Sequence, residues 1–434
     1  MMSLSSDSSY EDQQVNDFWL RLDNAAKIYP AVKDQELTSV FRVGVELKER
    51  IKAKQFFEAV HAIEHRFPYY KVQLKAGFFW YYLDPNDLPI PVEPDLATPC
   101  RAFQKNELMF RLLTKDNRIS VEFSHILTDG TGALEFLKTF LFVYLEKCCL
   151  QLPVSLPYYR PSETPSQEEY EDAYNHYFKK INSKAVKTPK AFHLPFSLKD
   201  APRFTVLTAI LSTQAIKIKA KEYDVSMTEY LTAVYLYSLQ NIYNQLTAFK
   251  KTTSRKIIRV EVPINLRRIF PSKTMRNFSL YVMPGIDLRL GQYSFEEIAK
   301  FVHHQMQLET DKKLISKMIS RNVSGEKNLF LRRVPLFIKS FILSKLYTQA
   351  TAQYSGVVTN LGNVSLAPEV DALINKFIFI PPPPSKTLKV NCAVAGFDNK
   401  LVLSFGNITT SKELERQFLT FLTSQGIPVK IVQH

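Results

Sequence analysis

Apolar residues recur along this chain with two periods, one typical of strands and one typical of helices. Ile119, Val121 and Phe123 alternate with polar neighbours, which is the two-residue period of a half-buried strand. After a loop that contains two glycines, apolar residues recur every three or four positions, which is the period of a helix. The pattern therefore predicts a strand over 118–124, a loop, and a helix over 133–147.

The same two periods, read with turn and capping signals, predict the other elements. Ser226 followed by Glu229 is a capping box that opens a helix, and Thr410 with Glu413 is read in the same way before the last helix. Further strands are predicted over 39–47, 69–74, 78–83, 107–114, 205–212, 215–220, 256–263, 354–361, 377–380, 388–395 and 400–406. Further helices are predicted over 13–27, 53–65, 168–180, 226–243, 294–314 and 334–347.

One segment is rich in proline and polar residues and is the clearest linker. It holds four prolines between 153 and 165, with serine and glutamate among them. We therefore expect an N-terminal half over 1–152, a connecting segment over 153–200, and a C-terminal half over 201–434.

The loop after the strand at 118–124 carries the residues best suited to chemistry. A neutral imidazole such as that of His125 can take a proton from a hydroxyl or amine while that group attacks a carbonyl. Asp129 is suited to hold the loop by pairing with an arginine, and Gly130 lets backbone approach closely. A lone histidine among apolar residues is more often a satisfied core or surface group. The context of strand, glycine turn and helix favours a functional site here.

The segment FSHILTDGTGALEFL at 123–137 resembles the active-site segment of a known superfamily. This superfamily contains chloramphenicol acetyltransferase, peptide-synthetase condensation domains and alcohol O-acetyltransferases, and the chain is most similar to bacterial alcohol acetyltransferase-like proteins. Stretches at 18–31, 66–83 and 262–278 agree, so the resemblance extends over almost the whole chain. Condensation domains usually carry a second histidine where this chain has Ser124, which favours a free-standing acyltransferase.

The resemblance implies an α/β (α+β sandwich) fold with two chloramphenicol-acetyltransferase-like halves, mixed sheets, and an active-site tunnel between them. It implies transfer of an acyl group from a coenzyme A or carrier-protein thioester to a hydroxyl acceptor, with His125 as general base, no acyl-enzyme, and no bound cofactor or metal. An N-acyltransferase or condensation-type enzyme, and a catalytically silent binding protein of the same fold, are the alternatives.

The resemblance also implies further site residues. The aspartate of the family motif is paired with an arginine, for which Arg267 or Arg268 is the candidate, unless both serve the surface. Asn360, Thr359 and the backbone N–H of Gly130 are candidate contacts to the substrate or the oxyanion, although Asn-x-Gly is also an ordinary turn. With Arg267, Asn360 and Thr359 form the predicted substrate-binding set.

Composition excludes several other classes. The 434 residues carry a net charge of +14, which suits a phosphate-bearing substrate such as coenzyme A, but no nucleic-acid motif is present. The chain has no Gly-x-Ser-x-Gly elbow and no zinc spacing, and its four cysteines are expected to be free thiols. The polar first residues and the lack of a long apolar run predict a cytoplasmic protein. For 334–347 an ordinary packed helix is favoured over one that touches a membrane.

Overall fold

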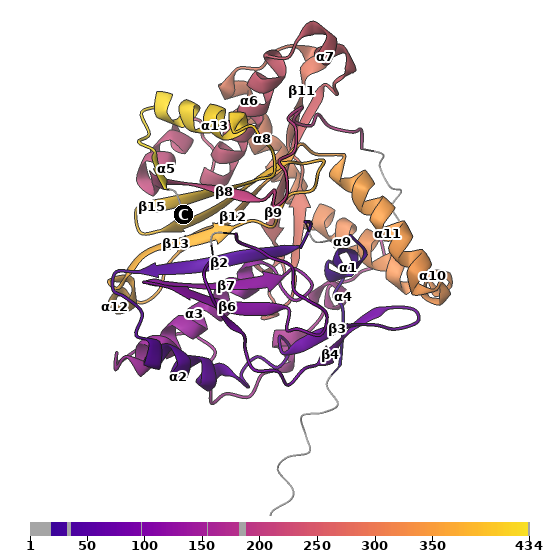
Figure 1. The fold of residues 1–434 in the computed structure, drawn as a ribbon. Coiled ribbons are helices and arrows are strands. Elements are labelled where there is room, and N and C mark those ends of the chain that lie inside the picture. Colours follow the sequence, from indigo (N-terminus) through magenta and orange to yellow (C-terminus); the bar gives the residue numbers. More distant parts are fainter. Residues whose placement is uncertain (1–18, 33–35, 97, 154, 182–187, 433–434) are drawn as a thin grey trace, which may run out of the picture.

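The computed structural model describes residues 19–32, 36–96, 98–153, 155–181 and 188–432. Two large mixed sheets lie one above the other in Figure 1, with helices on their outer faces, and a small three-stranded sheet lies beside them. The predicted α/β sandwich with two halves is confirmed.

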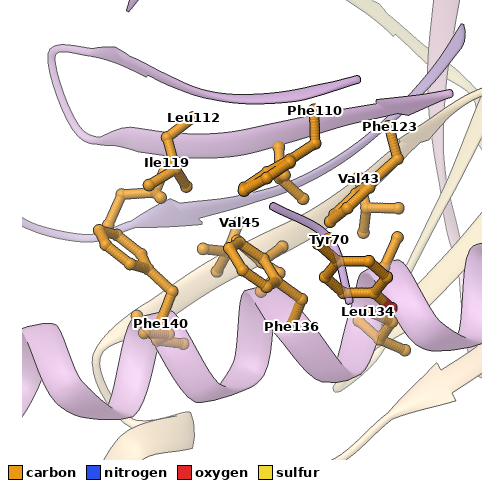
Figure 2. Close-up of a cluster of buried hydrophobic side chains, with 14 of the residues drawn as sticks. Val43, Val45, Tyr70, Phe110, Leu112, Ile119, Phe123, Leu134, Phe136 and Phe140 are labelled. Carbon is orange, nitrogen blue, oxygen red and sulfur yellow. The ribbon is translucent and has the colours of Figure 1, made fainter. Parts of the chain in front are cut away.

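The sheet of the N-terminal half holds the strand that ends at His125. Its order is β13 (Ile374–Ile380), β2 (Val40–Leu47), β7 (Arg118–Ser124), β6 (Phe110–Lys115) and β5 (Val92–Pro94), antiparallel except between β5 and β6. Helices α2 (Ala53–Ile63) and α3 (Gly130–Lys147) pack on each other, and α3 lies against β2 and β7. Figure 2 shows the core that results, where Phe136 and Phe140 of α3 face Val43 and Val45 of the sheet.

The sheet of the C-terminal half is larger. Its order is β10 (Ser279–Val282), β9 (Ile257–Asn265), β12 (Gly356–Val364), β14 (Val390–Phe397), β15 (Lys400–Asn407), β8 (Thr205–Ser212) and β16 (Lys430–Val432), and β11 (Gly285–Asp287) also pairs with β9. Strand β12 runs parallel to both β9 and β14. The outer helices are α5 (Thr213–Glu222), α6 (Met227–Asn244), α8 (Phe295–Glu309) and α13 (Glu413–Ser424), as Figure 1 shows.

One strand crosses between the halves. β13 comes late in the sequence but pairs antiparallel with β2, at the edge of the N-terminal sheet. Its neighbours in the chain, β12 and β14, belong to the other sheet. The crossing ties the two halves together and brings the β12 end toward the His125 loop.

Smaller elements complete the fold around these sheets. The three-stranded sheet has the order β1 (Leu20–Arg21), β4 (Tyr81–Pro85) and β3 (Val72–Ala76). The short helices are η1 (Ala26–Ile28), α1 (Tyr29–Val32), η2 (Gln167–Tyr170), α4 (Ala173–His176), α7 (Ala248–Thr253), η3 (Leu266–Arg268), η4 (Leu288–Leu290), α10 (Leu329–Arg333) and α12 (Pro368–Asp371), and the longer ones are α9 (Lys312–Lys327) and α11 (Leu336–Thr351). No helix within the described ranges is both long and apolar enough to cross a bilayer.

Most predicted elements are present, with ends that differ by a few residues, but four predictions are wrong. The predicted strand over 215–220 is helix α5, which begins because the Ser212 hydroxyl accepts from the Ala215 N–H at 3.1 Å. The predicted helix over 294–314 is two helices, since Asp311 caps a new one, α9. The predicted helix over 168–180 is only the short turns η2 and α4. The last helix is preceded not by a Thr410 cap but by Ser411, whose hydroxyl accepts from the Glu413 N–H at 3.1 Å.

Two further expectations concern apolar segments. Of the helix predicted over 13–27, residues 13–18 lie outside the described residues, and the remainder forms β1 and η1 instead of an α-helix. The predicted packed helix over 334–347 exists as α11, yet within it only Lys339 and Thr351 are buried. The expectation of a packed helix therefore holds for one side only: α11 contacts α1 and η1, whereas Phe337, Phe341 and Leu346 are exposed.

Candidate active site

His125 directly follows β7, and two hydrogen bonds and two neighbouring aromatic rings hold it in position. Its backbone N–H donates to the Ser39 carbonyl at 2.9 Å, and Nδ1 lies 3.2 Å from the Thr128 carbonyl oxygen. Because a carbonyl can only accept, this contact assigns the proton to Nδ1 and leaves the lone pair on Nε2. The ring stacks on Tyr29, with centroids 5.4 Å apart, and packs at a tilt of 31° against Phe41, with centroids 4.4 Å apart. The imidazole is thus held in one orientation, with its lone pair on Nε2.

Asp129 closes the loop and begins helix α3. One carboxylate oxygen accepts from the Thr131 and Gly132 N–H groups, both at 3.1 Å, as an N-cap. The other accepts from Arg267 Nη1 and from the Phe278 N–H, both at 2.8 Å. The predicted pairing with an arginine of the C-terminal half is therefore present, with Arg267 and not Arg268 as the partner.

Burial alone would raise the pKa of Asp129, but the ion pair with Arg267 and the N–H donors of Phe278 and Gly132 outweigh it. The net effect lowers the pKa of Asp129 below its usual value. Asp129 is therefore an ionised structural group that orients the loop, and its oxygens are all occupied.

Residues 274–278 of the C-terminal half hydrogen-bond to the same loop. Asn277 Nδ2 donates to the His125 carbonyl at 2.9 Å and to Asp23 Oδ2 at 3.1 Å. The Met275 carbonyl accepts from the Thr128 hydroxyl at 2.5 Å and from the Tyr70 hydroxyl at 2.6 Å. Two segments about 150 positions apart in the sequence thus form one rigid unit, and the His125 loop lies where the halves meet.

The two loop glycines serve different purposes. A Cβ on Gly132 would overlap the Thr128 hydroxyl and the Met275 carbonyl, so no side chain fits between the loop and residues 274–278. A Cβ on Gly130 would come within 2.9 Å of the end of the Leu361 side chain, which can move. As the first residue of α3, Gly130 also has an N–H that the helix leaves without a carbonyl partner.

Replacing Gly132 with alanine should destabilise the protein by about 1–3 kcal/mol, because backbone and a buried hydroxyl must move to admit the methyl group. Gly130→Ala should cost less, since only a flexible side chain is in the way. Thermal unfolding monitored by circular dichroism measures both. Gly325→Ala is the matched control: it is also helical and has no atom within 4 Å of the added carbon, so it should be neutral or stabilising. A Gly132→Ala protein as stable as the control would contradict the close fit.

A cavity of about 720 Å³ lies beside His125 and is lined by both halves. Ser39, His125 and Gly130 contribute from the N-terminal half, and Thr359 and Asn360 from the C-terminal half. Most of the wall is apolar, with polar groups at few points. Such a cavity is suited to an extended, largely apolar substrate that is oriented by a small number of hydrogen bonds.

The predicted substrate-binding residues fall into two groups. Thr359 and Asn360 line the cavity, although Asn360 already donates to the Thr228 hydroxyl at 3.0 Å and accepts from the Gly362 N–H at 2.8 Å. Arg267 does not line it, because its guanidinium is directed at Asp129 and at backbone carbonyls of residues 274 and 276. The prediction that Arg267 contacts substrate is therefore wrong, and it is a positioning residue.

Sequence reasoning missed several polar groups of the cavity wall. Ser39 and Asn391 are buried, and within the described part of the chain the Ser39 hydroxyl and the Asn391 amide oxygen have no hydrogen-bond partner. Burial raises the pKa of Glu261 to about 7, with Tyr354 as a hydrogen-bonding neighbour. These residues lie in strands or at strand ends whose sequence shows only alternation, so no motif marks them. Asn277, by contrast, lies in the 262–278 stretch that carries the family resemblance.

A reaction that used His125 as its base should persist to unusually low pH. Burial lowers the pKa of His125 from 6.5 to about 4, against the opposing effects of Asp129 and the Thr128 carbonyl. A base works only when unprotonated, so the acid limb of the kcat/KM profile of the free enzyme should fall near pH 4 instead of near 6.5.

The control for this profile is Glu261→Gln, because Glu261 titrates near pH 7 in the same cavity. An inflection near neutral pH that disappears in this variant belongs to Glu261, and the limb near pH 4 should remain. A limb near 6.5 that survives in Glu261→Gln would contradict the lowered pKa of His125.

Comparisons with known proteins agree with this architecture. The family model described as "Alcohol acetyltransferase" matches residues 208–380, a range that does not include the His125 loop. A search of curated proteins finds no match for the chain.

In the part of the chain that the structure describes, no group of three or more His, Cys, Asp and Glu residues is arranged to hold a metal ion.

Several solved structures share the fold over nearly their whole length. TRI101 of F. sporotrichioides, complexed with coenzyme A and T-2, has a TM-score of 0.63 at 10% identity, covering 95% of this chain and 99% of that one. The wax ester synthase/diacylglycerol acyltransferase of Marinobacter aquaeolei VT8 has a TM-score of 0.54 at 11% identity, covering 94% and 100%. The condensation domain of the Monacolin K polyketide synthase MokA has a TM-score of 0.55 at 12% identity, covering 94% and 96%. At these identities the likeness concerns the fold.

Proposed function

We propose that this protein is an acyltransferase that uses an acyl thioester and a hydroxyl acceptor. Two findings support the proposal: residues 208–380 match the alcohol acetyltransferase family, and the fold resembles those of TRI101 and of a condensation domain. The observation that carries this proposal is the His125 ring. Its Nδ1 is tied to the Thr128 carbonyl, so the basic Nε2 is left for a reactant at the cavity between the halves.

The proposed reaction needs one base and no covalent enzyme intermediate. Nε2 of His125 takes the hydroxyl proton as the acceptor oxygen bonds to the thioester carbonyl carbon. The tetrahedral oxyanion then collapses, the carbon–sulfur bond breaks, and the thiolate recovers the proton from Nε2. Ester and free thiol are the products, and the histidine returns to its starting state.

Three groups are candidates to support the oxyanion. The N–H of Gly130 begins helix α3, where the helix dipole favours negative charge, and the Asn360 amide lies across the cavity on β12. The Ser39 hydroxyl, which has no hydrogen-bond partner among the described residues, is next to the histidine in space, since the Ser39 carbonyl accepts from the His125 N–H. We assign Gly130 first, because its N–H is fixed by the helix that Asp129 caps.

The donor is best sought among acyl-coenzyme A thioesters. The TRI101 structure with a similar fold is a complex with coenzyme A, and the strongly basic chain, with a net charge of +14, suits a donor with phosphate groups. A carrier-protein thioester has the same pantetheine arm and fits the same cavity. For the acceptor, the apolar wall favours a lipophilic alcohol over a sugar.

The test is product analysis of the purified chain with acetyl-coenzyme A and a panel of alcohols and amines of increasing chain length. Free coenzyme A and esters are measured by mass spectrometry, because the exposed Cys149 thiol would react with a thiol dye. We expect ester formation that depends on the alcohol. Amide formation alone would indicate an N-acyltransferase. No product with any acceptor, with binding of acetyl-coenzyme A retained, would indicate a binding protein of the same fold.

A further inference from the structure

An apolar surface lies on the outside of the molecule beside the cavity. Helices α10 and α11 project at the right of Figure 1, above the tip of the β3–β4 hairpin. We call the exposed side chains there the α10–α11 surface, and its most exposed members are 51–78% accessible to solvent: Phe78, Leu329, Phe330, Phe337, Phe341 and Leu346. Exposed aromatic residues that gather in this way mark an interaction site.

The three elements of this surface are joined by specific contacts. The Leu336 N–H donates to the Phe78 carbonyl at 2.9 Å. The Lys339 ammonium is buried, donates to the Phe79 carbonyl at 3.0 Å and to the Arg332 carbonyl at 3.2 Å, and lies 3.5 Å from the centre of the Trp80 ring. One lysine thus binds the hairpin, α10 and α11 together, so the exposed rings form one built surface and not separate loose side chains.

Apolar residues lie on every side of helix α11, with two lysines and a few serine, threonine and glutamine residues among them. Its residues Ile342, Leu343 and Leu346 line the cavity that contains His125, while Phe337 and Phe341 face away from the core and remain 74% and 62% exposed. A helix that is apolar on all sides is normally covered on all sides. Here the protein covers one side only, and the uncovered side borders the cavity.

The charge around this surface identifies the covering partner. Between residues 327 and 351 the chain has no Asp or Glu and five basic residues, of which Lys339 is buried and four are exposed: Lys327, Arg332, Arg333 and Lys345. Aromatic and aliphatic side chains among lysine and arginine are the composition of segments that insert into the headgroup region of anionic membranes. We propose that the α10–α11 surface docks onto an anionic phospholipid bilayer.

Docking would place the cavity mouth at the lipid. Leu331, Ile342 and Leu346 are each at least 41% exposed and also line the cavity, so the surface and the cavity wall are continuous. An apolar substrate dissolved in the bilayer then reaches His125 without crossing water. This last step rests on the proposed acyl transfer, but the docking itself does not.

The experiment is co-sedimentation of the purified full chain with vesicles of phosphatidylcholine alone and of equimolar phosphatidylcholine and phosphatidylglycerol. We expect binding to the anionic vesicles that weakens with added salt, and much weaker binding to phosphatidylcholine. The variant Phe330→Ser/Phe337→Ser/Phe341→Ser should bind the anionic vesicles about tenfold or more weakly, because three inserting rings are lost. Its melting temperature should not fall, since all three side chains are more than half exposed.

The matched control is Phe249→Ser, which removes a phenylalanine that is 77% exposed on α7, distant from this surface in Figure 1. It should leave vesicle binding unchanged. Equal binding by the triple variant, or no binding of the wild type to anionic vesicles, would overturn the proposal. So would a lipid-free dimer that the triple variant abolishes, because the partner would then be a second copy. Binding is measured without turnover, so its failure leaves the acyl-transfer proposal standing.

Discussion

Replacing His125 with alanine should lower the rate of acyl transfer by about two to four orders of magnitude, the range that a general base contributes. The reason is that the Thr128 carbonyl holds the His125 ring in the tautomer with its proton on Nδ1. The basic Nε2 is then the atom available to a reactant in the cavity. Steady-state kinetics with acetyl-coenzyme A and the best alcohol found by product analysis would measure the effect. We expect kcat to fall, with little change in KM for either substrate.

The variant must also be shown to be folded, because the ring packs between Tyr29 and Phe41. Its melting temperature provides that measurement, and partial recovery of the rate with added imidazole would separate a lost base from a disturbed loop. His61→Ala is the matched control: His61 is an exposed histidine in α2, and its removal should leave the rate unchanged. Near-normal turnover by a folded His125→Ala protein would contradict the assignment of the base.

The loop and its flanking elements could be predicted from the sequence because the signals there are local. Alternation up to Phe123 specifies the strand, and the aspartate that caps α3 is adjacent to the helix it begins. Local signals fail where a competing one is stronger. Ile216 and Ile218 alternate as in a strand, yet the Ser212 cap starts a helix that contains both.

Contacts between distant segments could not be predicted in the same way. Alternation indicates that 377–380 is a strand, but it does not indicate that β13 pairs with β2, in the other half. Arg267 and Arg268 are adjacent and chemically identical, and only the turn of η3 decides that the first faces Asp129 while the second is exposed. Asn277 and Met275 contact the His125 loop only because the C-terminal half packs against the N-terminal half.

Replacing Asp129 with asparagine should destabilise the protein by about 3–5 kcal/mol, the usual cost of breaking a buried ion pair by removing one partner. Asparagine keeps one oxygen for the N-cap, but its NH₂ group would face Arg267 Nη1 and the Phe278 N–H, so donor would meet donor. Activity should fall as well, because the same carboxylate begins α3 at Gly130 and holds the loop of His125.

Chemical unfolding of Asp129→Asn beside Asp311→Asn would test this prediction. Asp311 caps α9 through the N–H groups of Lys313 and Leu314 and makes no ion pair among the described residues, so its replacement should be nearly neutral. The double variant Asp129→Asn/Arg267→Met should be more stable than Asp129→Asn alone, because the unpaired buried charge is gone. Equal stability of Asp129→Asn and the wild type would show that the ion pair does not hold the loop.

The pH dependence gives an independent check of the same contact. The pKa of Asp129 is lower in the folded protein than in the unfolded chain, so the unfolded chain takes up the proton first as the pH falls. The stability that Asp129 contributes is therefore complete above the unfolded pKa of about 3.8 and is lost as the pH falls toward the lower folded value. In Asp129→Asn this part of the acid destabilisation should be absent, and the difference in unfolding free energy between the two proteins should shrink below pH 4. A difference that stays constant down to acid unfolding would mean that the asparagine disturbs packing and not the charge pair with Arg267.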